Sequence, residues 1–134
     1  MGENVIASLT VLGVMGVADA VWLTTMTDRF YRRELPGLLA DTPMWAPALG
    51  FYLLYAIATL VLVVIPALDG EHSAGRVAAT GALLGLAAYG TYDLTNLATL
   101  QGWSVKVTIV DMAWGALLTA VAATAAVLAA RGLA

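Results

Sequence analysis

The chain has 134 residues, of which 61% are hydrophobic and 11% charged, and its formal net charge is −3 at pH 7. Soluble domains are about one-quarter charged, so this composition excludes an ordinary soluble protein and predicts an integral membrane protein. The six cationic residues are scattered over predicted loops and ends, which excludes a nucleic-acid-binding surface, and the lack of cysteine excludes disulfides and thiolate chemistry.

Four apolar stretches are long enough to cross a lipid bilayer, at residues 5–26, 44–68, 77–100 and 107–130. Each exceeds the ~20 residues that a helix needs to cross a hydrocarbon core of ~30 Å. We therefore expect an all-α fold, an integral membrane four-helix bundle with four transmembrane helices, in which residues 1–134 form a single domain.

The first predicted helix lies where a signal peptide would. Ala18, Asp19 and Ala20 have the small-x-small form of a cleavage site. Residues 1–4 carry no basic side chain, however, and the apolar run continues beyond the site. We expect a retained membrane helix.

The loops carry the signals that begin the later helices. Thr42 followed by Pro43 predicts an N-cap for the second helix, and Ser73 and Ser104 predict caps for the third and fourth. The loop before Thr42 mixes charges with apolar residues, which predicts a segment on the membrane surface, interrupted at Pro36: Phe30, Tyr31, Leu35, Leu38 and Leu39.

Basic residues predict the orientation. The first and third loops hold four of them, Arg29, Arg32, Arg33 and Lys106, whereas the opposite side holds Arg76 and Arg131. The excess favours loops one and three in the cytoplasm, with both termini outside, in a cell inner membrane.

Small residues recur within the spans and predict close packing of helices inside the bundle. They are Gly13 and Gly16 in the first span, Gly81 and Gly85 in the third, and Ala116, Ala120 and Ala123 in the fourth.

Three aspartates, Asp19, Asp93 and Asp111, lie inside apolar stretches that contain no lysine or arginine. An acidic side chain in hydrocarbon costs several kcal/mol, so it is usually kept for a task. By helix rise, the three acids and Tyr52 lie roughly 7–12 Å from the side that holds loops one and three. The sequence thus predicts a polar layer in one leaflet.

Helical spacing gives each acid polar or aromatic neighbours, and these complete the predicted site. Trp22 shares a face with Asp19, and Trp114 lies at the edge of the face of Asp111. The remaining candidates lie on one face of the second span or one face of the third: Tyr52, Tyr55, Tyr89, Tyr92 and Asn96. Lipid cannot satisfy these groups, so the faces should turn inward and meet.

Three neighbouring carboxylates cannot all be ionised cheaply without a cation. Either at least one is protonated, or a bound cation neutralises them, or arginines of loop one fold over them. Protonation favours proton relay, a caged cation favours ion coupling, and arginine closure favours a static core or an anionic ligand. A buried network that only joins the helices is the structural alternative.

Several chemistries are excluded. The only histidine, His72, and the only lysine, Lys106, lie in loops or at a span boundary, so neither haem nor retinal is expected. No nucleotide-binding motif is present. A metal ion would need oxygen ligands, for which Asp19, Asp93 and Asp111 are the candidates.

The chain resembles a family of small bacterial membrane proteins, domain of unknown function 2177, over nearly its whole length. The resemblance rests on one string in each span: Asp19-Ala-Val-Trp22-Leu23, Phe51-Tyr52-x-x-Tyr55, Tyr89-Gly-Thr-Tyr92-Asp93-Leu-Thr-Asn96 and Asp111-Met-Ala-Trp114-Gly115. It implies four membrane spans and contributes no mechanism.

Three functions fit these observations. The first is a proton- or cation-linked transporter or channel, with a small-molecule or ion ligand. Because one bundle is too small to enclose a wide path alone, a homo-oligomer is one option. The second is a membrane-embedded enzyme or accessory factor acting on a lipid-soluble substrate, with the three aspartates as acid, base or metal ligands. The third is a non-catalytic assembly partner of a larger membrane complex.

Overall fold

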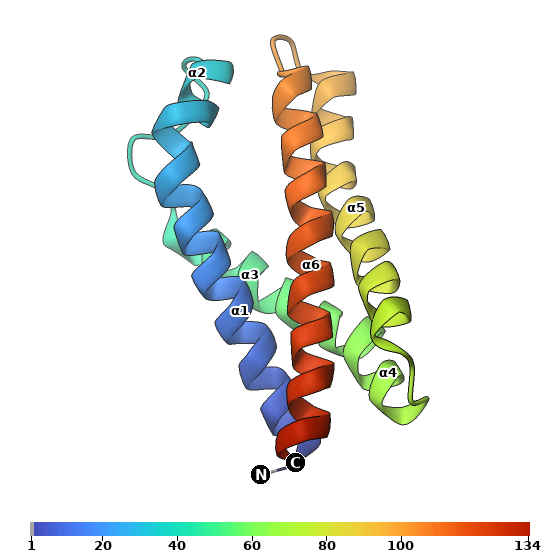
Figure 1. Cartoon of the computed structure of the whole chain (residues 1–134). Helices are drawn as coiled ribbons and strands as arrows, with labels where there is room; N and C mark the ends of the chain where they lie inside the picture. Colours follow the sequence, from blue (N-terminus) through green and yellow to red (C-terminus); the bar gives the residue numbers. More distant parts are fainter. Residues whose placement is uncertain (1) are drawn as a thin grey trace.

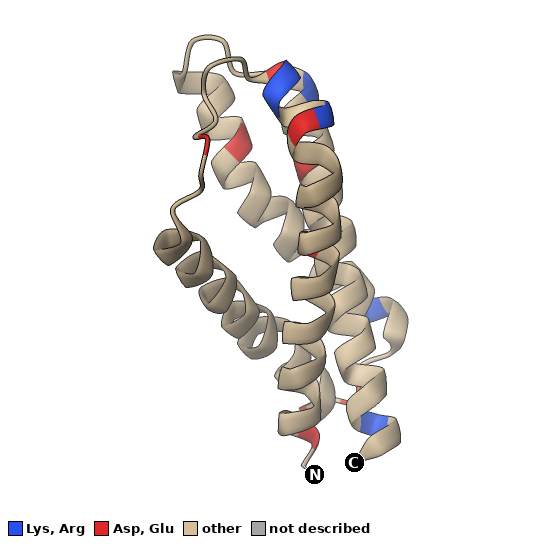
Figure 2. Cartoon of the chain, turned by 90° about the vertical axis from the view of Figure 1, so that its left-hand side faces the viewer, with Lys and Arg blue, Asp and Glu red and all other residues tan. Residues whose placement is uncertain are grey.

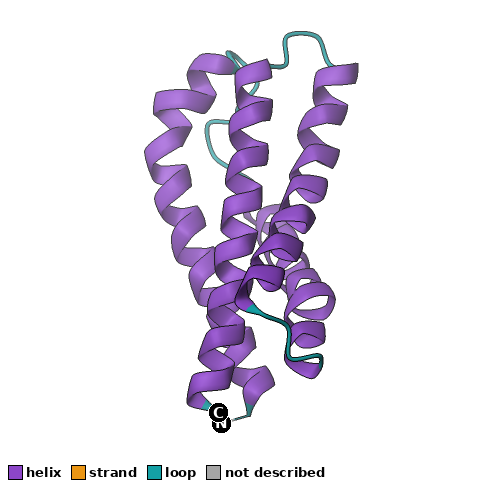
Figure 3. Cartoon of the chain, turned by 45° about the vertical axis from the view of Figure 1, so that its right-hand side comes forward, coloured by secondary structure: helices purple, strands orange, loops and turns teal. Residues whose placement is uncertain are grey.

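Residues 2–134 form four long helical segments. The structure is a computed structural model and describes residues 2–134. Within that range every regular element is helical (Figure 3), so the all-α prediction is confirmed. The first segment runs through α1 (Glu3–Met26), a π-helical turn η1 (Thr27–Tyr31) and α2 (Arg32–Glu34).

The second segment also contains a π-helical turn. It runs through α3 (Trp45–Thr59), η2 (Leu60–Val64) and α4 (Ile65–Asp69), and is followed by the single helices α5 (Ala74–Thr99) and α6 (Val105–Leu133). Within residues 2–134, three helices are long and apolar enough to cross a membrane: Glu3–Glu34, Trp45–Asp69 and Val105–Leu133. Helix α5 has the length, but polar residues at 89–96 lower its hydropathy.

Helix α6 is the centre of the molecule. It packs along α5 on one side and α1 on the other, and both termini lie at the same end (Figure 1). The α3–α4 segment crosses obliquely in the half that holds the termini. Basic residues gather at the end opposite the termini and are sparse in the half that holds the termini (Figure 2), an asymmetry expected for helices that cross a bilayer.

Glycines set the close approach of α5 to α6, as the sequence predicts. A Cβ on Gly85 would overlap the backbone of Gly115, and one on Gly81 would lie 3.0 Å from the carbonyl oxygen of Thr119. Gly16 of α1 lies against the hydroxyl of Tyr52. Gly13, by contrast, meets no atom within 4 Å among residues 2–134, so it makes no close approach there.

The helix starts agree with two of the three predicted caps. Ser73 accepts a hydrogen bond from the Arg76 backbone, and Ser104 accepts one from the Val107 backbone. The predicted cap at Thr42 is wrong, because α3 begins three residues later, at Trp45. Met44 is the residue before the first helical turn, and its side chain makes no capping hydrogen bond.

Loop one is also shorter than expected. The first helical segment continues to Glu34, and Leu35, expected on the membrane surface, is only 5% exposed. Tyr31 turns back toward the bundle, where its hydroxyl contacts α6.

Candidate functional site

Asp93 and Asp111 form a carboxyl pair between α5 and α6. Their side chains lie close enough for their charges to interact strongly. Asp93 is completely buried, and neither of its carboxyl oxygens has a hydrogen-bond partner among residues 2–134. A buried carboxylate without a partner is costly, so Asp93 must hold a proton or face a bound cation.

Tyr31 links this pair to the first helical segment. Its hydroxyl donates to Oδ1 of Asp111 and accepts a hydrogen bond of 2.9 Å from the indole nitrogen of Trp22. Tyr31 belongs to η1, at the end of the molecule that carries the loop-one arginines. The hydroxyl therefore lies between the carboxyl pair and that end.

Trp22 and Trp114 join α1 to α6. Their rings stack with 4.2 Å between centroids and 9° between planes. The indole nitrogen of Trp114 donates to Oδ1 of Asp19 at 3.3 Å. Each tryptophan follows an aspartate by three residues on antiparallel helices, so Asp19 and Asp111 lie on opposite sides of the ring pair, separated by roughly 9 Å along the bundle.

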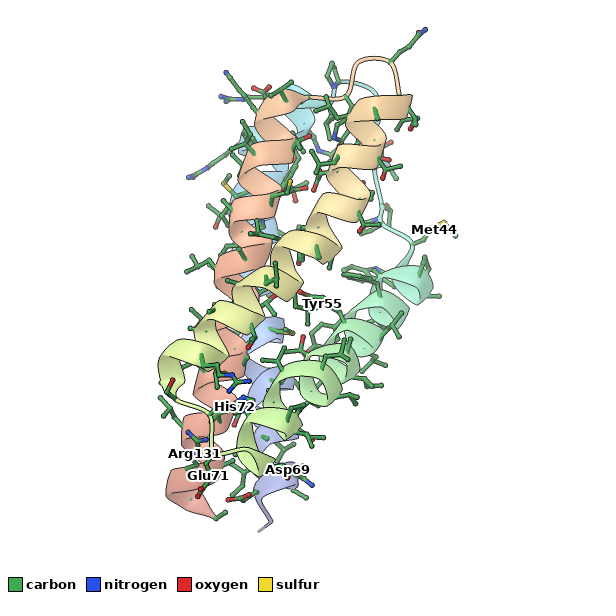
Figure 4. All side chains as sticks on the ribbon, turned by 90° about the vertical axis from the view of Figure 1, so that its right-hand side faces the viewer. Met44, Tyr55, Asp69, Glu71, His72 and Arg131 are labelled. Carbon is green, nitrogen blue, oxygen red and sulfur yellow. The ribbon has the colours of Figure 1, made fainter. Side chains whose placement is uncertain are left out.

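Tyr55 is the main contact of α3 with the centre of the bundle. It reaches from α3 into the space beside α5 (Figure 4), is only 7% exposed, and its hydroxyl lies 2.7 Å from the Thr119 hydroxyl. Its ring packs edge-on against Tyr89, with centroids 6.0 Å apart. The Thr119 hydroxyl in turn donates to the Gly115 carbonyl, so the hydroxyl groups of Tyr55 and Thr119 both have hydrogen-bond partners.

Tyr89 lies between the two polar groups. Its ring occupies the space that a side chain at Gly115 would fill. Tyr89 is close enough to Asp19, and to Asp111 and Asp93, for its hydroxyl to interact electrostatically with all three carboxyl groups.

A cavity of about 330 Å³ opens beside Asp111. It is lined by side chains of α3, α5 and α6, three of them aromatic: Phe51, Ala88, Tyr89, Tyr92 and Asp111. Its volume lies at the small end of the range for ligand sites, about 300–1,000 Å³. The cavity thus gives a compact molecule access to one member of the carboxyl pair.

The remaining predicted residues lie at the edge of this arrangement. Tyr92 is 58% exposed and packs edge-on against Trp103, and Asn96 lies beside it on α5. Tyr52 donates its hydroxyl to the Leu12 carbonyl and so attaches α3 to α1.

The structure therefore brings Asp93 and Asp111 together and leaves Asp19 apart. Among residues 2–134, no three acidic or histidine side chains form a group that could hold a metal ion. The carboxyl pair can exchange protons or bind a cation, whereas Asp19 is bonded to Trp114 and joins two helices.

Two residues of the site escape sequence reasoning. Tyr31 lies nine residues after Trp22, which in a regular α-helix would put it on the opposite face. The wider π-helical turn η1 brings it back. Phe51 belongs to a motif of the second span, but its spacing alone does not mark it as a cavity wall.

Comparison with known proteins identifies a family. A family model described as "Predicted membrane protein (DUF2177)" matches residues 4–128. No curated protein and no solved structure matches the chain.

Proposed function

The chain belongs to the DUF2177 family of predicted membrane proteins, and on that premise we propose that it is a proton-linked transporter whose proton site is the Asp93–Asp111 pair. One observation carries the proposal: Asp93 is 0% exposed, and within the described residues no hydrogen-bond donor other than a shared proton on the neighbouring carboxyl of Asp111 serves its oxygens. A carboxylate that served only to join helices would be expected to accept from a separate donor, as Asp19 does from Trp114.

The pair gains a proton when the site is empty and loses it when a cation arrives. Two adjacent carboxylates in a low-dielectric interior repel one another, so one proton stabilises the empty pair. A positive charge in the cavity replaces that proton. This exchange couples the release of a proton to the binding of the transported cation.

Tyr31 offers a path for the proton. Its hydroxyl bonds Asp111, and it lies at the end of the bundle with the four basic loop residues. A proton leaving Asp93 passes to Asp111; the Tyr31 hydroxyl then turns its hydrogen away from Asp111, accepts that proton on its oxygen and releases its own proton to water at that end. By the excess of basic residues, this end faces the cytoplasm, with both termini outside an inner membrane.

Helix α5 completes a four-span bundle in this proposal. It is long enough to cross and packs along α6 through glycines, while Asp93, on its polar stretch, is buried against that helix. Its hydropathy is lower because its polar residues are surrounded by the other helices and not by lipid.

Proteoliposomes that enclose a pH-sensitive dye test the proposal. Under an imposed pH gradient with the membrane potential clamped, and with sodium, potassium and benzylammonium ions supplied on the side opposite the proton excess as exchange partners, wild-type protein should move protons faster than empty vesicles. Asp93→Asn should fall at least tenfold toward the empty-vesicle rate, while Asp41→Asn, a change in an exposed loop residue, should match wild type. Equal flux for wild type, Asp93→Asn and empty vesicles would contradict the proposal.

A structural role is favoured for one part of the network. Asp19, Trp114 and Trp22 are mutually bonded or stacked across α1 and α6. We assign this group to helix association, not to transport.

A further inference from the structure

The cavity beside Asp111 combines an acid with aromatic walls. Three of its five lining side chains are rings, Phe51, Tyr89 and Tyr92, and none of the five carries a positive charge. Phe51 also stacks on Tyr55, with 5.6 Å between centroids and 14° between planes, so the α3 side of the cavity is a supported aromatic face.

The charge of the site selects a cation. Asp111 lines the cavity, and the buried Asp93 lies behind it, where the two carboxyl groups interact and Asp93 has no other hydrogen-bond donor among residues 2–134. An anionic ligand would meet two carboxyl groups, and a neutral ligand would leave Asp93 uncompensated when it loses its proton. A cation is attracted by both carboxyl groups and compensates the charge of Asp93 when that residue loses its proton.

The walls select an organic cation over a metal ion. Hard metal ions require six or more oxygen ligands, whereas this cavity presents mostly ring carbon. Aromatic faces attract ammonium groups, and the attraction increases when water is excluded. The apolar remainder of such a molecule packs against Ala88 and the rings.

We propose that this cavity binds a small organic ammonium ion with an apolar body. Asp111 holds its charged end, the buried carboxyl of Asp93 lies behind Asp111, and Phe51, Tyr89 and Tyr92 surround the ion. The inference rests on the proposed function, because the ammonium ion is the solute that replaces the proton. The exchange balances: the protonated pair releases one proton to solvent as one ammonium ion binds. The volume of about 330 Å³ restricts the ligand to a compact one.

Calorimetry on the purified 134-residue chain in detergent tests the inference. The probes are benzylammonium, cyclohexylammonium and benzyltrimethylammonium, with benzyl alcohol as the uncharged match for the first. At least one cation should bind saturably and at least tenfold more tightly than benzyl alcohol. The absence of saturable binding by all three cations, or equal binding of benzylammonium and benzyl alcohol, would overturn the inference.

Variants locate the binding to this cavity. Asp111→Asn should remove the preference for charge, and Phe51→Leu should weaken cation binding by about threefold to thirtyfold, as expected for loss of one cation–π contact. Phe51→Tyr keeps the ring and should bind as wild type does. Because Phe51 is 53% exposed, its variants are expected to fold even if Asp111→Asn does not. Unchanged binding in Phe51→Leu would contradict the assignment.

Proton release separates this inference from the proposed function. In weakly buffered solution, binding of one cation should release one proton. Cation binding without proton release would support the ammonium site and refute the proton linkage. Proton flux that depends on Asp93, together with no binding of any probe, would support the linkage and refute the ammonium site.

Discussion

Trp22 and Trp114 lie parallel, 4.2 Å apart between ring centroids, and they separate the bundle into two polar groups. On one side Asp19 accepts a hydrogen bond from Trp114. On the other side Asp111 is bonded to Tyr31 and lies beside the unpartnered Asp93. The same residue type thus has a structural role at one position and, in our proposal, a proton-binding role at the other two.

The ring pair should stabilise the fold. Trp22→Leu removes the stack and the bond to Tyr31, and should lower the free energy of unfolding by about 1–3 kcal/mol. Reversible unfolding in mixed detergent measures the change. Trp45→Leu replaces a tryptophan that is 64% exposed and serves as the control, with little expected effect. If both variants lose equal stability, the stack has no special role.

Gly115 should be required to keep Tyr89 at the cavity. A Cβ at this position would overlap the Tyr89 ring, so Gly115→Ala should displace the ring and lower stability by about 1–3 kcal/mol. Gly13→Ala is the matched change on α1, where a Cβ meets no atom within 4 Å among the described residues, and it should be tolerated. Thermal unfolding and the cation affinity of both variants check the prediction. Full affinity in Gly115→Ala would show that Tyr89 is not a cavity wall.

Tyr31 should control the rate at which protons reach the carboxyl pair. Tyr31→Phe keeps the ring but removes the hydroxyl that bonds Asp111. Because the proposed path runs through this hydroxyl, we expect proton flux in proteoliposomes to fall at least tenfold while one proton is still released per bound cation. Wild-type flux in this variant would exclude the path through Tyr31.

Stability of the empty protein should depend on pH in a defined direction. The buried pair retains a proton that the unfolded chain releases, so the native state binds more protons and stability falls as pH rises. Asp93→Asn removes the acid and should flatten this dependence. Unfolding free energies measured in detergent across the pH range check the sign. Stability that rises with pH in the wild type, and not in Asp93→Asn, would mean that Asp93 is stabilised as a carboxylate.

The sequence predicts the helices and the acidic layer because both depend on local spacing. Four apolar stretches give four long helical segments, and Ser73 and Ser104 cap α5 and α6 as expected. The polar faces of the third and fourth spans meet as predicted for Asp93 and Asp111, since glycines let α5 and α6 approach closely.

The remaining features depend on geometry that spacing does not contain. The position of Tyr31 depends on a π-helical turn, which an α-helical pattern does not reveal. The separation of Asp19 from the other acids follows from the stacking of Trp22 on Trp114, which is a contact between helices. The second helical segment crosses obliquely in the half of the bundle that holds the termini, a tilt that the length of its apolar stretch does not reveal.

The central claim is that the Asp93–Asp111 pair holds an exchangeable proton, and infrared difference spectroscopy measures that proton directly. When purified protein in the absence of ligand is taken from acidic to alkaline pH, the wild type should lose a band of a protonated carboxyl group in an apolar environment. This band should be absent in Asp93→Asn and present in Asp41→Asn. A spectrum without such a band in the wild type, or with the same band in Asp93→Asn, would contradict the account.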